Sequence, residues 1–150
     1  MANIIVSSCL LGCNCRYDGK NCLNKDVRIL SKKHTLIPIC PEQMGGLSTP
    51  RSPSEIVNTK VISKNGNDVT NQYNKGALMA LKIAKVNNCS YALLKTKSPS
   101  CGKGKIYDGS FSGKLIEGDG ITVKLFKENN IKVFSDLELN ELQKELCELK

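Results

Sequence analysis

Short apolar runs and longer amphipathic segments alternate along this chain. The apolar runs cover residues 3–7, 35–39, 91–94 and 131–134, and such unbroken runs are typical of strands buried on both faces of a parallel sheet. Apolar residues recur at helical spacing between and after these runs. The alternation predicts an α/β fold, a Rossmann-like three-layer sandwich with a mostly parallel sheet.

Four segments carry the helical spacing. A modest helix is expected over residues 24–32, and a longer one begins near Asp68 or Thr70 and ends at Asn87. A third opens at Asp119 and ends before residues 129–130. The last follows a capping box at residues 135–138, and its apolar stripe consists of Leu142, Leu146 and Leu149.

Three segments interrupt this alternation. An Asn-Gly pair at residues 65–66 lies between the apolar stretch 61–63 and Val69, which predicts a small antiparallel hairpin excursion. Residues 41–53 form a long proline- and glycine-containing loop, and residues 98–118 are punctuated by glycine. Long loops within a compact domain usually serve a function.

Length and composition narrow the class of protein. The 150 residues fit one domain, 1–150, with one sizeable core. The chain has no signal-like segment and no run long enough to cross a bilayer, so we expect a cytoplasmic protein whose thiols stay reduced. The net charge of +8 has no aromatic RNA-binding signature beside it, so nucleic acid is not the expected partner. The oligomeric state is not indicated.

Cysteine is the residue type that needs an explanation, with eight copies against one histidine. The lone His34 disfavours a Cys-His nucleophile pair, and the chain has no phosphate-binding P-loop. Cys9, Cys40 and Cys101 each follow one of the predicted strands. Carboxyl ends of parallel strands meet at one edge of a sheet, so these three thiols are expected to converge on one metal centre. Thiolates hold iron-sulfur clusters or structural zinc.

The other cysteines are less informative. Cys89 and Cys147 are expected to be small buried hydrophobes. Cys13, Cys15 and Cys22 lie in a loop, and each is open to three interpretations: a fourth ligand, a sulfur acceptor or a bystander.

Polar residues near the three strand ends are candidates for catalysis. Glu42 lies two residues after Cys40 and is suited to act as a general base, although a surface or helix-start glutamate is an equally good interpretation. Ser98 and Ser100 precede Cys101 and can donate a hydrogen bond or simply form a turn. Arg16 and Arg51 lie in loops that reach the same edge, where they can orient a polar heterocycle.

Several ordered segments resemble the thiouracil desulfurase family, and the resemblance covers nearly the whole chain. The matching segments are Ser8-Cys9-Leu10-Leu11-Gly12, Arg16-Tyr17-Asp18-Gly19, Cys40-Pro41-Glu42-Gln43, Gly45-Gly46-Leu47, Thr49-Pro50-Arg51, Lys97-Ser98-Pro99-Ser100-Cys101-Gly102, Tyr107-Asp108-Gly109 and Phe111-Ser112-Gly113.

The resemblance implies an enzyme with a [4Fe-4S] cluster bound by Cys9, Cys40 and Cys101, with one iron left for the sulfur of a substrate. It implies a non-redox reaction that converts the thiocarbonyl of 2-thiouracil, or of a similar thiolated heterocycle, to a carbonyl and releases sulfide. Glu42 would activate water and Ser98, or alternatively Ser100, would assist. Two alternatives stay open: a metal-stabilised RNA-binding module, and a cluster-based sulfur carrier with Cys13 or Cys15 as acceptor.

Overall fold

A four-stranded sheet forms the centre of the protein, for which a computed structural model describes residues 1–148. Its strands are β1 (Asn3–Ser7), β2 (Thr35–Ile39), β5 (Tyr91–Leu94) and β8 (Lys132–Ser135). They lie in the order β2-β1-β5-β8, and every neighbouring pair is parallel. The four predicted apolar runs are therefore the four strands of the sheet, within one residue at β8.

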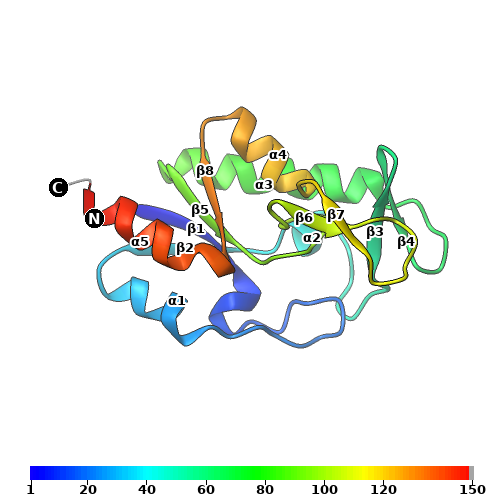
Figure 1. Cartoon of the computed structure of the whole chain (residues 1–150), viewed down its shortest axis with the longest axis horizontal. Coiled ribbons are helices and arrows are strands. Elements are labelled where there is room, and N and C mark those ends of the chain that lie inside the picture. The colour runs from blue at the N-terminus through cyan, green and yellow to red at the C-terminus, as the bar shows by residue number, and fades with distance from the viewer. Residues whose placement is uncertain (149–150) are drawn as a thin grey trace.

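Helices cover both faces of this sheet and complete the predicted three layers. The helices α3 (Thr70–Val86) and α4 (Ile121–Glu128) pack on one face, while α1 (Lys25–Ile29) and α5 (Leu139–Glu148) lie on the other (Figure 1). The first predicted helix is shorter than expected, because a 3-10 turn at Leu30–Lys32 replaces its end.

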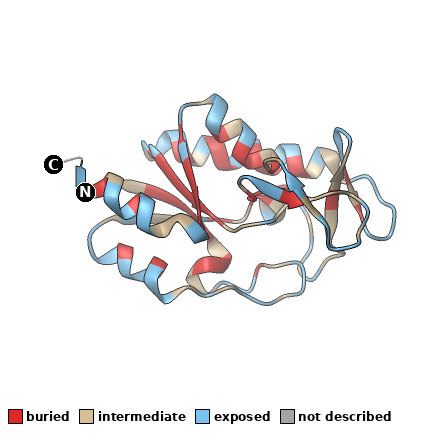
Figure 2. Ribbon diagram, in the orientation of Figure 1, coloured by how far each residue is buried: buried red, intermediate tan, exposed pale blue. Residues whose placement is uncertain are grey.

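Successive side chains of each strand point to opposite faces of the sheet and pack into two apolar cores. On β1, Ile5 packs in the core with α3 and α4, whereas Ile4 and Val6 pack in the core with α1 and α5. All three side chains are fully buried. Figure 2 shows the sheet strands as the most continuous buried part of the chain. This two-sided burial explains why the strands are apolar without alternation.

The small antiparallel excursion exists at the predicted turn as a single bridge, and a longer hairpin that was not predicted precedes it. The hairpin consists of β3 (Ser54–Val57) and β4 (Lys60–Ser63), which pair across a turn at residues 58–59. The Asn65–Gly66 turn leads only to an isolated bridge between Ile62 and Asp68. Asn58 has the positive φ that the tight turn between β3 and β4 requires.

Two segments expected to be loops contain short regular elements. A one-turn helix, α2 (Pro41–Met44), follows Cys40 directly, and β6 (Lys105–Tyr107) pairs with β7 (Leu115–Glu117) in the glycine-rich segment. Both flank the carboxyl edge of the sheet. The last residue of the predicted C-terminal stripe, Leu149, lies outside the described residues. Within residues 1–148 no helix combines the length and apolarity that a membrane crossing needs.

The connectivity places a crevice at the carboxyl edge. From β1 the chain crosses through α1 to β2 on one side, and from β2 it returns through α3 to β5 on the other side of β1. The order of the strands thus reverses beside β1, and ligands of such sheets bind where this reversal occurs.

Candidate metal centre and active site

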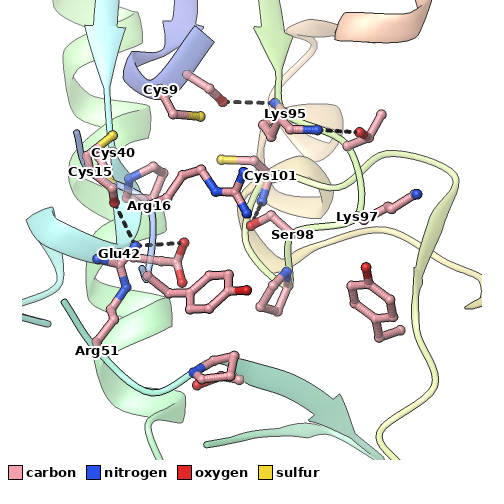
Figure 3. A pocket seen from close by; sticks show the side chains of 18 of the residues that line it. Cys9, Cys15, Arg16, Cys40, Glu42, Arg51, Lys95, Lys97, Ser98 and Cys101 are labelled. Carbon is pink, nitrogen blue, oxygen red and sulfur yellow. Dashed lines mark hydrogen bonds and ion pairs between the residues drawn. The ribbon is translucent and has the colours of Figure 1, made fainter. Parts of the chain in front are cut away.

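The three cysteines predicted to converge line one cavity. Cys9, Cys40 and Cys101 border a cavity of about 430 Å³ at the carboxyl edge of the sheet, and Glu42 borders it too. In Figure 3 the thiols of Cys9 and Cys101 point toward each other, with Cys40 and Cys15 beside them. Residues separated by as many as 92 positions therefore face one space, because the strands before them are parallel neighbours.

Local structure fixes each of these cysteines. Cys9 lies in the 3-10 turn Ser8–Leu11 that follows β1, and Cys40 precedes the proline that starts α2. The loop of Cys101 is held by Ser98, whose Oγ accepts hydrogen bonds from the backbone N–H of Ser100 and of Cys101, each at 3.0 Å. The thiols are thus presented by rigid backbone.

Burial and neighbouring groups favour the neutral thiols of Cys40 and Cys101 in the protein without metal. Burial raises the pKa of the Cys101 thiol to about 12. The pKa of Cys40 rises even further, first because of its hydrogen bond with the Cys15 thiol and then because of burial. Iron binding at these positions must therefore displace protons from neutral thiols.

Of the cysteines left open by the sequence, only Cys15 reaches the other thiols in the described part of the chain. It is buried and lines the cavity, and its carbonyl oxygen accepts a 3.7 Å hydrogen bond from the Cys40 thiol. The Cys40 side chain lowers the pKa of Cys15, but the Cys9 side chain and burial outweigh it and raise that pKa to about 11. Cys13 is exposed, and the Cys22 sulfur accepts a 3.0 Å hydrogen bond from Nη1 of Arg16.

The two remaining cysteines differ from each other. Cys89 is buried, as predicted, whereas Cys147 is exposed and the expectation of burial was wrong. Cys147 follows Leu146 on α5, one residue beyond the stripe that packs on the sheet, so its side chain turns to the outer surface.

The donor set fits a cluster better than a single ion. Among residues 1–148, no three His, Cys, Asp or Glu side chains converge closely enough to hold one metal ion. A [4Fe-4S] cluster does not need such convergence, since each thiolate binds a different iron atom. The three thiols lie around a cavity, on three separate segments, and all are soft sulfur donors of the kind that iron-sulfur clusters take.

Glu42 lies in a prepared hydrogen-bonding environment. Its Oε1 accepts a short hydrogen bond from the hydroxyl of Tyr73, and its Oε2 lies 3.3 Å from Nη2 of Arg51. Tyr73 is buried, and its pKa is raised by burial, then by the charge of Glu42 and the hydrogen bond to it. The carboxylate is thus fixed by two side chains while its own side chain stays 18% exposed.

Close packing of two helices brings Tyr73 to Glu42. At Gly76 of α3 an added Cβ would lie 1.8 Å from the Pro41 carbonyl oxygen, and at Gly45, after α2, one would lie 1.9 Å from the Gln72 carbonyl oxygen. Only glycine allows the two backbones to approach this closely. Tyr73 was not among the predicted site residues, because its spacing in the sequence fits one more apolar residue on the stripe of α3.

The two candidate serines occupy different positions. Ser98 lines the cavity, whereas Ser100 is fully buried behind the loop and shares a 2.7 Å hydrogen bond with the hydroxyl of Thr122. Because the Ser98 Oγ accepts two backbone hydrogen bonds, its own proton remains to be donated toward the cavity.

The rest of the wall is basic and aromatic. Arg16 and Arg51 both line the cavity, as predicted. Further lining side chains are Tyr17, Lys64, Lys95, Lys97, Tyr107 and Phe111. Glu55, a second glutamate of this wall, was not predicted. It accepts hydrogen bonds from the backbone N–H of Gly109 and of Phe111. These bonds connect the loop of Gly109 and Phe111 to the β3–β4 hairpin.

Comparisons with known proteins agree with this chemistry. The family model described as 2-thiouracil desulfurase matches residues 4–138. The uncharacterized protein YbbK of Bacillus subtilis (strain 168) is 43% identical over an alignment of 149 positions, which covers 93% of this chain and 99% of that protein. The solved structure of the [4Fe-4S]-dependent thiouracil desulfidase TudS is similar, with a TM-score of 0.93 and 40% identity. It covers 98% of this chain, and this chain covers 99% of it.

Proposed function

Because the chain belongs to the 2-thiouracil desulfurase family, we propose that it is a [4Fe-4S]-dependent enzyme that replaces the sulfur of a thiolated pyrimidine by oxygen. The substrate is 2-thiouracil or a similar small heterocycle, and the products are the corresponding carbonyl compound and sulfide. The observation that carries this function is the meeting of Cys9, Cys40 and Cys101 with Glu42 around one cavity.

The three cysteines are the proposed cluster ligands. Each would bind one iron through its thiolate, and for Cys40 and Cys101, whose pKa values are raised, binding would displace the thiol proton. When bound, the cluster supplies a fourth iron that acts as a Lewis acid on the thiocarbonyl sulfur. The donor set of this chain supports that assignment, since the thiols come from three separate segments that border one cavity.

Glu42 is the proposed general base. The Tyr73 hydroxyl and the Arg51 guanidinium hold its carboxylate at the cavity wall, so it need not reorient before it takes a proton. Removing a proton from water as the oxygen adds to the ring carbon makes that water a stronger nucleophile. The proton accepted by Glu42 is then available for the departing sulfur or the ring nitrogen.

Ser98 is the proposed hydroxyl partner. Its Oγ accepts from two backbone N–H groups, which leaves its own proton to be donated to a heterocycle in the cavity that Ser98 lines. Ser100 remains the second candidate from the sequence, but its hydroxyl is engaged with Thr122 away from the cavity. We therefore assign the substrate contact to Ser98 and a structural role to Ser100.

The alternative functions have less support. The RNA-binding module rests on net charge alone. A sulfur carrier needs an acceptor thiol at the cavity, and of its two candidates Cys15 lines the cavity while Cys13 is exposed. The cytoplasmic location and the single domain over residues 1–150 stay predictions.

One experiment tests the function directly. The protein is reconstituted without air, its iron and acid-labile sulfide are measured, and sulfide release is followed with a panel of thiolated pyrimidines. We expect a brown, iron-containing protein that releases sulfide, and a Glu42→Ala variant that binds iron equally but releases far less sulfide. A colourless protein that takes up stoichiometric zinc under these conditions would refute the proposal.

A further inference from the structure

Phe111 is a large aromatic residue that the apolar cores do not use. The other two phenylalanines of the chain, Phe126 and Phe134, are buried and pack on opposite faces of the sheet. Phe111 is only half-buried, belongs to neither core of the described chain and lines the cavity. Within residues 1–148 its ring has no aromatic or cationic partner. An unused aromatic ring in the wall of a binding cavity indicates a contact with the molecule that binds there.

The backbone at Phe111 adopts a conformation that bulky residues rarely take. Its φ is 57°, in the left-handed region. Five non-glycine residues of the described chain have a positive φ, and three of them are asparagines, which tolerate it best. The other two, Phe111 and Lys97, both line the cavity. Strained backbone that collects around one cavity favours a functional origin of the strain.

A buried carboxylate holds Phe111 in this conformation. Oε1 of Glu55 accepts hydrogen bonds from the backbone N–H of Gly109 at 3.0 Å and of Phe111 at 3.2 Å. Glu55 is only 8% exposed, and in the part of the chain that the structure describes it forms no ion pair. Burying a carboxylate without a cation lowers stability. Costs of this kind are expected at functional sites, and here the cost serves to place one loop.

The rest of this loop is rigid as well. Oδ1 of Asp108 accepts a hydrogen bond from the backbone N–H of Ser110 at 2.9 Å. Gly109 lies so close to β3 that an added Cβ would be 2.8 Å from the Ile56 carbonyl oxygen. The ring of Phe111 is therefore presented by a fixed loop, which reduces the entropy lost when a ligand packs against it.

We propose that the ring of Phe111 stacks on the face of the heterocycle and that Glu55 is the positioning residue that holds Phe111 for this contact. The inference rests on the proposed function and adds a determinant of its substrate: the thiocarbonyl must belong to a flat, aromatic ring. Glu42 and Ser98 provide the polar groups of the cavity, which act on the edge of such a ring. Stacking on Phe111 reads the face and is insensitive to the substituents at the edge.

The test compares two ligands that do not react and differ only in the flatness of the ring. Uracil and 5,6-dihydrouracil share both carbonyl and both N–H groups, but saturation of one bond removes the aromatic face and puckers the ring. Binding of each to the reconstituted enzyme is measured by titration calorimetry. Stacking on an aromatic side chain predicts about 5- to 50-fold tighter binding of uracil to the wild type.

Variants of Phe111 assign this preference to its ring. Phe111→Leu keeps an apolar side chain but removes the flat face, so the preference should fall to about twofold or less. Phe111→Tyr keeps the face and should keep the preference. Lys114→Leu is the matched control, because it places the same leucine at an exposed position of the same loop. Its preference should equal that of the wild type. Thermal unfolding and iron content establish which variants are intact.

Variants of Glu55 test whether it acts through Phe111. Glu55→Ala removes the acceptor of both backbone hydrogen bonds, so the preference should fall as in Phe111→Leu. Glu55→Gln retains an acceptor oxygen and should restore most of the preference. The double variant Glu55→Ala/Phe111→Leu should lose no more preference than Phe111→Leu alone, since two residues that act as a unit are not additive. Additive losses would show that Glu55 does not act through Phe111.

The outcomes separate this inference from the function beneath it. A wild type that releases sulfide but binds uracil and 5,6-dihydrouracil equally overturns the stacking role of Phe111, whether or not the variants fold. An intact Phe111→Leu variant that keeps the preference, or that weakens binding of both ligands equally, also overturns it, because a purely structural side chain would act in that way. A wild type that prefers uracil but releases no sulfide from any thiolated pyrimidine contradicts the proposed function instead.

Discussion

Two sides of the same cavity differ in how their functional groups are stabilised in the protein without cofactor. On the thiol side, Cys9, Cys40 and Cys101 lie at the sheet edge among apolar residues, and those with a raised pKa are neutral without metal. On the carboxylate side, Glu42 and Arg51 form an ion pair within the protein, and Tyr73 donates to the same carboxylate. The thiol side is completed only when a cofactor binds. The carboxylate side is held in place by contacts within the protein.

The difference follows from the cost of burying each group. A thiol is a weak hydrogen-bonding group that behaves as a small hydrophobe, so it can lie in a core without dedicated partners. A carboxylate or a guanidinium must be paired when it is taken out of water. Replacing a thiol should therefore affect the cofactor first, while replacing a partner of Glu42 should affect the reaction and leave the cofactor in place.

The largest expected effect is loss of the cofactor. Cys40→Ser replaces a soft sulfur donor with a hydroxyl that binds iron poorly, so the reconstituted variant should lack most of its cluster and all sulfide release. Iron content and visible absorption after reconstitution measure this. Cys13→Ser is the control, because Cys13 is exposed and should be dispensable. Wild-type iron content in Cys40→Ser would remove Cys40 from the ligand set.

A large effect without cofactor loss is expected on the other side. Glu42→Gln keeps the shape of the side chain but cannot accept a proton from water, so kcat should fall about 10²- to 10⁴-fold. Iron content should stay at the wild-type level. A variant with full iron and near-normal turnover would show that another group activates the water.

The sequence predicted these two sides unequally. The thiol side was predictable, because a cysteine follows each of three apolar runs and parallel strands bring their carboxyl ends together. The partners of Glu42 were not. Tyr73 lies 31 residues away on a helix stripe that any apolar residue would satisfy, and only the approach of the helices at Gly76 and Gly45 brings its hydroxyl to the carboxylate.

The hairpin shows the same limit. Asn65–Gly66 is a strong local turn signal and the residues after it do form the expected antiparallel bridge, but β4 also pairs over its whole length with β3, which was not predicted. Pairing with β3 lets the buried Glu55 hold the loop around Phe111. The contact of Glu55 with this loop joins residues 54 and 56 positions apart, and no local sequence pattern predicts a contact of that kind.

A moderate effect is expected from Tyr73→Phe, which removes the hydroxyl that fixes Glu42 but keeps the ring that fills the core. Loss of this hydrogen bond to a charged group should lower kcat about 10-fold, with KM and iron content little changed. Tyr91→Phe is a matched control on the sheet, where the ring packs against Phe134. Equal losses of kcat in both variants would show that Tyr73 does not act through Glu42.

The smallest expected effect concerns the pH dependence of stability in the metal-free protein. Burial raises the pKa of Cys101 from its ordinary value near 9 to about 12. Above pH 9 the unfolded chain therefore loses this proton while the folded protein keeps it. The stability that the neutral thiol contributes is fully present below pH 9, and it is lost progressively as the pH rises toward 12.

Cys101→Ala removes this contribution, so its unfolding free energy should fall less between pH 8.5 and 10.5 than that of the wild type, by about 1 to 2 kcal/mol. Urea unfolding at the two pH values measures the difference, and comparing variants cancels the lysines and tyrosines that titrate in the same range. Cys13→Ala, at an exposed position, should follow the wild type. An equal pH dependence in Cys101→Ala and the wild type would mean that the Cys101 thiol is not held neutral by burial, and the contrast between the two sides of the cavity would lose its physical basis.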